Sequence, residues 1–248
     1  MGKSGDTIKI NTGNTLLVAH QGLFVKERGN TIPAFRDSSK RNFFGAECDV
    51  HTTTDKKFVI IHDETTGSIS ETNINVEQST YDEVRSVKIR SVYEDTNYSD
   101  DDLKIPSLEE YVNLCKSGNI SCVIELKNPL SAADVDLLIK EITDLYSLDK
   151  IIFISFHFDN LTKVRSILPE QKLQYLVTKF DENVLARMNE YNMDIDIAWP
   201  ALTKEVIDEC HANGHVVNTW TVDDAGLIEK FAGWGVDYIT TNYFEKAD

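Results

Sequence analysis

Two runs of the sequence that have the character of strands carry charged side chains in alternation with apolar ones. Glu47 and Asp49 flank Cys48 within the apolar run 45–50. Alternate residues of a strand lie on one face, so the two carboxylates are expected to point the same way. Burying two such groups without partners is costly. The pattern therefore indicates a site for a hard cation such as Mg²⁺ or Ca²⁺, and the alternative is a pair of exposed acids at a strand edge.

The run 122–127 repeats this design, with Glu125 and Lys127 on one face of its carboxyl end. In barrels of alternating strands and helices, the carboxyl ends of the strands carry the active site. Glu125 can then complete a cation site of three carboxylates, and Lys127 can hold an anionic oxygen. A buried Glu–Lys pair with a purely structural role is the alternative.

Histidines end two further apolar runs, His20 after residues 16–19 and His62 after residues 58–61. A single histidine at a strand end is more often a hydrogen-bonded structural residue than a catalyst. Two of them beside an acidic cluster favour catalysis, because imidazole takes up and releases protons near neutral pH. On either side of a metal-bound phosphate, they would serve as general base and general acid.

The roles of two other side chains stay open. His51 shares the face of Asp49 if the strand continues that far, but it can equally lie in the following turn, and it receives no role. Trp220 ends the run 216–220, where an aromatic ring can line a substrate pocket or pack in the core or rim.

Short β-branched runs alternate with amphipathic runs along the chain. Strands are predicted at residues 16–20, 45–50, 58–61, 122–127, 151–155, 173–177, 194–198, 215–220 and 237–240, and helices near 31–42, 107–118, 131–147, 159–168, 181–190, 203–213 and 224–234. Only residues 51–57 separate the second and third strands, whereas a parallel crossover needs about a dozen residues or more. The run 58–61 must therefore return antiparallel, as a hairpin.

The eight remaining strands, joined by helix-sized segments, predict a (β/α)8 TIM barrel. Such barrels typically need about 250 residues, and the chain has 248, which we interpret as one domain spanning residues 1–248. In residues 63–105, apolar residues recur with neither the period of a strand nor that of a helix. A structureless loop of this length is unusual, so the segment is predicted to be an insertion over the barrel mouth with a short helix near 80–87.

The formal charge is −16, from 25 Lys+Arg and 41 Asp+Glu, and it argues against a partner that is a nucleic acid or an anionic membrane. Residues 1–6 lack the apolar run of a signal peptide, and no apolar stretch approaches the roughly 20 residues of a membrane span. A cytoplasmic location is expected, with export left open should a signal have been removed. The oligomeric state is left open. The four cysteines lack metal-site spacing and are expected to be reduced and buried.

Taken in order along the chain, the motifs resemble the glycerophosphodiester phosphodiesterase family. The matching segments are His20-Gln-Gly22, Asn30-Thr-Ile-Pro-Ala-Phe35, Glu47-Cys-Asp-Val50, Thr54-Asp55, His62-Asp63, Pro106-Ser-Leu-Glu-Glu110, Glu125-Leu-Lys127, Ser155-Phe156, Trp220-Thr-Val222, Gly235-Val-Asp237 and Ile239-Thr240. The resemblance implies hydrolysis of a small glycerol phosphodiester to glycerol 3-phosphate and an alcohol. It also implies that Glu47, Asp49 and Glu125 bind one divalent cation, Mg²⁺ or Ca²⁺. His20 and His62 would then act as base and acid, and Lys127 would hold the phosphate.

The sequence departs from the family pattern at two places. Gln21 replaces an arginine that would grip phosphate, and a neutral amide cannot replace a guanidinium. Gly29 stands where the family has a glutamate. Glu27 lies two residues out of register, so it either substitutes through a loop insertion or the carboxylate is absent. Two alternatives follow: a phosphodiesterase for another diester such as a lysophospholipid, or a non-catalytic barrel that binds glycerol phosphates.

Overall fold

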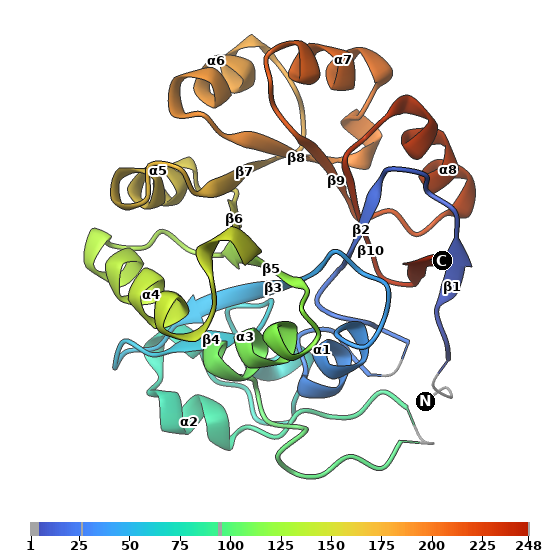
Figure 1. Cartoon of the computed structure of the whole chain (residues 1–248). Coiled ribbons are helices and arrows are strands. Elements are labelled where there is room, and N and C mark those ends of the chain that lie inside the picture. The colour runs from blue at the N-terminus through green and yellow to red at the C-terminus, as the bar shows by residue number, and fades with distance from the viewer. Residues whose placement is uncertain (1–4, 26, 94–95, 248) are drawn as a thin grey trace.

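The protein is an eight-stranded parallel barrel closed by the pairing of its first and second barrel strands (Figure 1). The computed structural model describes residues 5–25, 27–93 and 96–247, so residues 1–4 of the N-terminal segment considered above lie outside it. The barrel strands are β2 (Leu16–Ala19), β3 (Gly45–Thr52), β5 (Ser121–Leu126), β6 (Ile151–Ser155), β7 (Lys172–Val177), β8 (Asp194–Ala198), β9 (Val217–Trp220) and β10 (Tyr238–Thr241). The predicted (β/α)8 barrel is confirmed.

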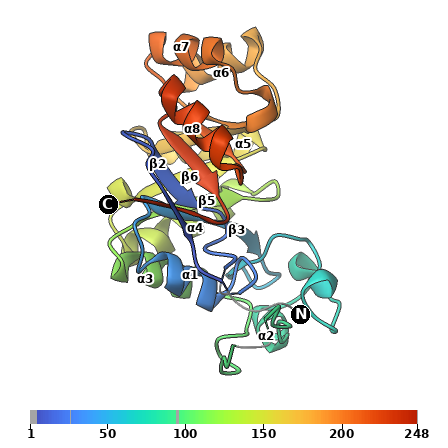
Figure 2. The same ribbon diagram turned by 90° about the vertical axis from the view of Figure 1, so that its right-hand side faces the viewer.

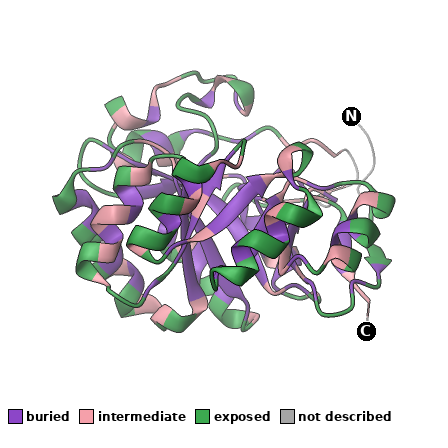
Figure 3. Ribbon diagram, turned by 90° about the horizontal axis from the view of Figure 1, so that it is seen from above, coloured by how far each residue is buried: buried purple, intermediate pink, exposed green. Residues whose placement is uncertain are grey.

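Helices cover the outside of the ring, with buried faces toward the strands and exposed faces outward (Figures 1 and 3). They are α1 (Ile32–Ser38), α3 (Leu108–Ser117), α4 (Ala132–Leu145), α5 (Phe158–Ile167), α6 (Glu182–Tyr191), α7 (Lys204–Ala212) and α8 (Ala225–Trp234), with short 3-10 turns at Leu148–Lys150 and Trp199–Ala201. Local sequence sets the helix ends. Ser107 and Glu110 form a capping box at the start of α3, and Gly235 ends α8 at a φ of 89°.

The antiparallel strand β4 (Phe58–Ile60) extends β3 beyond the barrel. One edge of β3 pairs with β5, and β2 occupies the other edge only at Gly45 and Ala46. The rest of that edge is therefore free to pair with β4. This confirms the predicted hairpin, which brings His62 back to the carboxyl end of the barrel.

Residues 63–105, of which 94 and 95 lie outside the described residues, fold against β4. They contain 3-10 turns at Thr66–Ser68 and Val76–Gln78 and the helix α2 (Tyr81–Ser86), which confirms the short helix near 80–87. A small separate core holds the segment in place, formed by Val59, Ile61, Val76, Val84, Val87, Ile89, Leu103 and Ile105. The segment lies beside the barrel opening and not across it, so its predicted place over the mouth is wrong (Figures 1 and 2).

Two short strands near the chain ends were not predicted. β1 (Ile8–Ile10) pairs in parallel with β11 (Phe244–Lys246) as a separate two-stranded sheet. Runs of three residues are too short to show a period of two. Cys48, Cys115, Cys122 and Cys210 are buried and unpaired, as expected. Among the described residues, no helix is long and apolar enough to cross a membrane.

The close approach of α3 to the end of α1 gives a test of the packing. A Cβ on Gly118 would lie 2.1 Å from the backbone oxygen of Ser39, so we expect Gly118→Ala to lower the free energy of unfolding by about 1–3 kcal/mol, as in other overpacked sites. Gly233→Ala is the control, because nothing lies within 4 Å of its Cβ position and alanine favours the helix by about 0.5–1 kcal/mol. Equal urea midpoints for the two variants would contradict this packing.

Candidate active site

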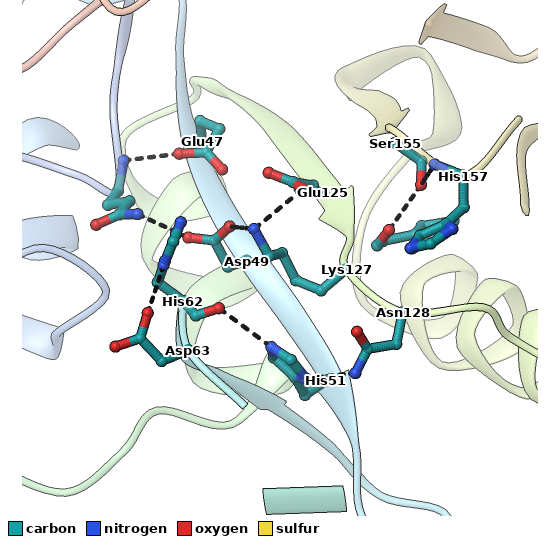
Figure 4. Close-up of polar contacts among 12 residues, drawn as sticks. Glu47, Asp49, His51, His62, Asp63, Glu125, Lys127, Asn128, Ser155 and His157 are labelled. Carbon is teal, nitrogen blue, oxygen red and sulfur yellow. Dashed lines mark hydrogen bonds and ion pairs between the residues drawn. The ribbon is translucent and has the colours of Figure 1, made fainter. Parts of the chain in front are cut away.

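Three carboxylates from β3 and β5 meet inside the carboxyl end of the barrel (Figure 4). Asp49 pairs with Glu125 across the β3–β5 ladder, and Glu47 lies two residues earlier on the same face of β3. One oxygen of each carboxylate lies within 4.8 Å of the other two, and all three side chains are buried. The structure therefore brings the three predicted cation ligands together.

Lys127 is the cation that contacts this cluster. Its Nζ lies 3.2 Å from Asp49 Oδ1 and 3.1 Å from Glu125 Oε1. Burial, with the neighbouring carboxylates, raises the pKa of Glu47 well above its usual value and that of Glu125 to about 7. Burial acts to raise the pKa of Asp49, but Lys127, the two histidines and the hydrogen bond from Asn30 together lower that pKa. Oxygen donors that carry more negative charge than one lysine balances fit a hard divalent cation.

Two amides hold the cluster from the loop after β2. Gln21 Nε2 and Asn30 Nδ2 donate to Asp49 Oδ2 at 2.8 and 2.6 Å, and the backbone N–H of Gln21 donates to Glu47 Oε2 at 2.9 Å. Both residues have left-handed backbones, with φ of 51° and 56°. A Cβ on Gly29 would lie 2.6 Å from Gln21 Oε1, so only glycine leaves room for this arrangement. Gln21 thus supports a carboxylate, and Asn30 is a contact that its sequence motif did not reveal.

Glu27 faces away from the cluster, although it is fully buried. Its carboxylate accepts hydrogen bonds from Ser91 Oγ at 2.5 Å and from the backbone N–H groups of Val92 and Arg28 at 3.0 and 2.7 Å. It therefore fastens the 63–105 insertion to the loop after β2. These partners belong to the insertion and to the loop itself, so the contacts of Glu27 give no support to its substitution for the family glutamate.

His20 is oriented from behind by a chain of side chains. Its Nδ1 lies 2.8 Å from Asn242 Oδ1, and Asn242 Nδ2 donates to Asp223 Oδ2 at 2.6 Å. Because that amide presents its oxygen to the ring, Nδ1 carries the hydrogen, and Nε2, 4.0 Å from Glu47 Oε2, faces the cluster. Burial is the main cause of a lowered pKa for His20. Sequence reasoning missed Asn242 and Asp223, whose only signal is their place after barrel strands.

His62 follows β4 and is oriented by the insertion. Its Nδ1 lies 2.8 Å from Asp63 Oδ1, and Asp63 Oδ2 accepts from Ser68 Oγ at 2.6 Å. The carbonyl of His62 lies 3.3 Å from Nε2 of His51, whose Nδ1 lies 3.1 Å from Glu77 (Figure 4). His51 therefore belongs to β3 and supports the backbone of His62. The insertion supplies most of the contacts that place the second histidine.

A cavity of about 230 Å³ joins these groups. The acidic cluster, Lys127 and both histidines line it. It is also lined by Ile154, Phe156, Leu176, Asp196, Trp220, Thr221 and Thr240, and the wall that carries Asp196 is on β8, which stands opposite β3 in the ring of strands. Trp220 lines the cavity, with its ring centroid 5.6 Å from that of Phe156 at 88°. Seven of the eight predicted site residues line this cavity. Gln21 instead lines an adjoining cavity of about 110 Å³ next to His62.

Residues 20–246 match the glycerophosphoryl diester phosphodiesterase family, and the chain belongs to that family. Glycerophosphodiester phosphodiesterases of Bacillus altitudinis and Caldanaerobacter subterraneus are 28% and 27% identical to it, over 94% and 92% of this chain and 96% and 94% of theirs. An Oleispira antarctica phosphodiesterase, solved with its product sn-glycerol-3-phosphate, has a TM-score of 0.84 at 18% identity, covering 92% of this chain and 93% of its own. A glycerophosphodiester phosphodiesterase from Parabacteroides distasonis has a TM-score of 0.79 at 25% identity, covering 96% and 94%. The predicted family and enzyme class are confirmed.

Crowding of the three carboxylates predicts that one of them reduces the stability of the metal-free protein. We expect Glu47→Gln, which keeps an oxygen to accept from the Gln21 N–H, to raise the melting temperature in EDTA by roughly 2–4 °C, equivalent to about 1 kcal/mol. The stabilisation by Mg²⁺ or Ca²⁺ should be lost in the same variant. Glu229→Gln, at an exposed position of α8, is the control and should change neither value. A melting temperature lowered by Glu47→Gln in EDTA would show that the carboxylates do not repel one another.

Proposed function

We propose that the protein hydrolyses glycerophosphodiesters to sn-glycerol 3-phosphate and an alcohol, with one divalent cation held by Glu47, Asp49 and Glu125. The observation that carries the proposal is the convergence of these buried carboxylates and two oriented histidines on one cavity of about 230 Å³. The names of the relatives and the product bound to the Oleispira enzyme support the substrate class. When bound, the cation, Mg²⁺ or Ca²⁺, supplies positive charge next to the phosphoryl oxygens as negative charge builds on them.

The surroundings of the two histidines suit different roles. Asp63 places a carboxylate against Nδ1 of His62 and so orients the ring, and we assign His62 as the general acid for the leaving oxygen. His20 has an amide as its Nδ1 partner, and its lowered pKa keeps the ring neutral. His20 therefore serves as the general base that takes the proton of the attacking hydroxyl.

Lys127 provides the charge that holds the phosphate. Its ammonium stands between Asp49 and Glu125 on the cavity wall, and the two carboxylates raise its pKa to about 12 although burial opposes this. It therefore remains charged at neutral pH and can contact a non-bridging oxygen of the diester. A diester carries one negative charge, which Lys127 and a cation can match without the arginine that Gln21 replaces.

The size of the cavity favours a small diester over a lysophospholipid. A volume of about 230 Å³ is below the range of roughly 300–1,000 Å³ of pockets for drug-sized ligands, so an acyl chain would have to lie outside it. The acidic surface, with a net charge of −16, gives no attraction to anionic lipid. The two oriented histidines argue against a barrel that only binds glycerol phosphates.

Loss of either histidine or of the cation should abolish turnover. We expect His20→Ala and His62→Ala each to lower kcat for glycerophosphocholine by about 10²-fold or more, the usual contribution of general acid–base catalysis, and EDTA to remove activity until Mg²⁺ or Ca²⁺ is restored. His211→Ala is the control, because His211 pairs with Asp237 away from the cavity. Choline release would be measured. Glycerol phosphate binding without any hydrolysis under any of these cations would leave only the binding alternative.

A substrate panel separates the two candidate diesters. From the cavity size, we expect kcat/KM of the wild-type protein for glycerophosphocholine and glycerophosphoethanolamine to exceed that for lysophosphatidylcholine by about 10-fold or more, a difference within reach of a single pocket. Gln21→Arg should leave this order unchanged, because Gln21 contacts Asp49 and does not line the main cavity. Faster cleavage of lysophosphatidylcholine by the wild-type protein, reversed by Gln21→Arg, would favour the alternative.

A further inference from the structure

Asp196 of β8 is a buried carboxyl group on the wall of the cavity that faces the acidic cluster. Its side chain is 2% exposed and lines the cavity. Its Oδ1 has no hydrogen-bond partner among the described residues. Apolar side chains from β6, β7 and β9, or from the residue after β6, line the cavity beside it. They are Ile154, Phe156, Leu176 and Trp220.

The polar residues next to Asp196 are satisfied without it. Asn218 Nδ2 donates to Gln174 Oε1 at 3.2 Å, and Thr240 Oγ1 donates to Asn218 Oδ1 at 3.3 Å. Asp194, two residues earlier on the same strand, accepts from the backbone N–H of Val216 at 2.7 Å. Among the described residues, Thr52 Oγ1 is the only other buried side-chain oxygen or nitrogen without a partner, so the feature is not general in the barrel interior.

A buried polar oxygen without a partner costs about 1–3 kcal/mol. Such groups are rare in folded proteins, and each one calls for an explanation such as a ligand that completes the hydrogen bond. Since Asp196 is one of the residues that line the cavity, a ligand bound there is the partner nearest at hand for its carboxyl group. A hydrogen bond from the ligand would then restore the free energy that the unpartnered oxygen of Asp196 costs the unliganded protein.

The position of Asp196 determines which part of a substrate it would contact. On the proposed function, the phosphate lies at the acidic cluster and Lys127, and Asp196 stands on β8, opposite β3 in the ring of strands. The part of the substrate that reaches Asp196 must be able to donate a hydrogen bond. A hydroxyl group meets this condition, and the glycerol half is the part that all glycerophosphodiesters share. A trimethylammonium group carries no hydrogen to donate.

We propose that Asp196 binds a hydroxyl group of the glycerol half of the substrate and so selects glycerol phosphodiesters over diesters without hydroxyl groups. The inference rests on the proposed function, because it takes the phosphate position from it. Phe156 and Trp220 then enclose the carbon chain of the glycerol, while Asp196 supplies the one polar contact of that wall. Trp220 also holds the strand, because its Nε1 donates to the backbone oxygen of Asp196 at 3.2 Å.

The test compares two ligands that differ only in hydroxyl groups, sn-glycerol 3-phosphate and n-propyl phosphate, by calorimetry with saturating Mg²⁺ or Ca²⁺. In Asp196→Leu we expect the Kd of glycerol 3-phosphate to rise about 10-fold or more, in line with a hydrogen bond to an ionisable group. The Kd of n-propyl phosphate should be unchanged. Asp196→Asn, which keeps an oxygen acceptor, should stay within about 3-fold of the wild type. The kcat/KM for glycerophosphocholine should follow the glycerol 3-phosphate affinity.

Asp194→Asn is the matched control on the same strand, and it should leave both affinities unchanged. Asp196→Leu should melt no lower than the wild type, because it removes an unpartnered buried group. The inference would be overturned if Asp196→Leu lost the same affinity for both ligands, or lost affinity for neither. A lower metal stoichiometry in Asp196→Leu would also overturn it. If the wild type hydrolyses glycerophosphodiesters but the Asp196 variants show one of these results, only this inference falls. If the wild type hydrolyses none, the proposed function falls and takes the inference with it.

Discussion

Mutual repulsion of three buried carboxylates is the constraint on which the site depends. Glu47, Asp49 and Glu125 lie side by side because strand alternation and the β3–β5 register put them on one interior face. The protein compensates part of this charge with Lys127 and with the amide of Gln21. On the proposed function, a bound cation would relieve the repulsion that remains, and the metal-free protein would be less stable because of it.

The insertion is part of how the site is built. It carries Ser68, which holds Asp63 against His62, and Glu77, which contacts His51 behind the same histidine. Glu27 fastens the insertion to the loop after β2, the loop that also supplies Gln21 and Asn30 to the acidic cluster. Glu27, which by its place in the sequence was a candidate for the missing family glutamate, instead connects the insertion to the loop after β2.

On the proposed function, the residues that line the cavity divide the work of recognition. The ionisable groups at the ends of β3 and β5 would act on the phosphate, whereas β8 and its neighbours present aromatic and aliphatic side chains with the carboxyl group of Asp196. An anion can enter so acidic a protein only because positive charge is concentrated at one place, at Lys127 and the proposed cation. This division places charge recognition and shape recognition on different strands, so either can change without the other.

The amino-acid sequence by itself determined the barrel, the hairpin and the inward face of each catalytic strand. Strand alternation and loop length are local properties, so Glu47, Asp49 and Glu125 could be placed without coordinates. Tertiary structure alone decided the hydrogen-bond partners. Asn242 reaches His20 across 222 residues of chain, and Glu27 turns to Ser91. Amide and carboxylate groups can pair with many partners, and only the folded chain determines which of them meet. Asp196 Oδ1 meets none among the residues that the structure describes.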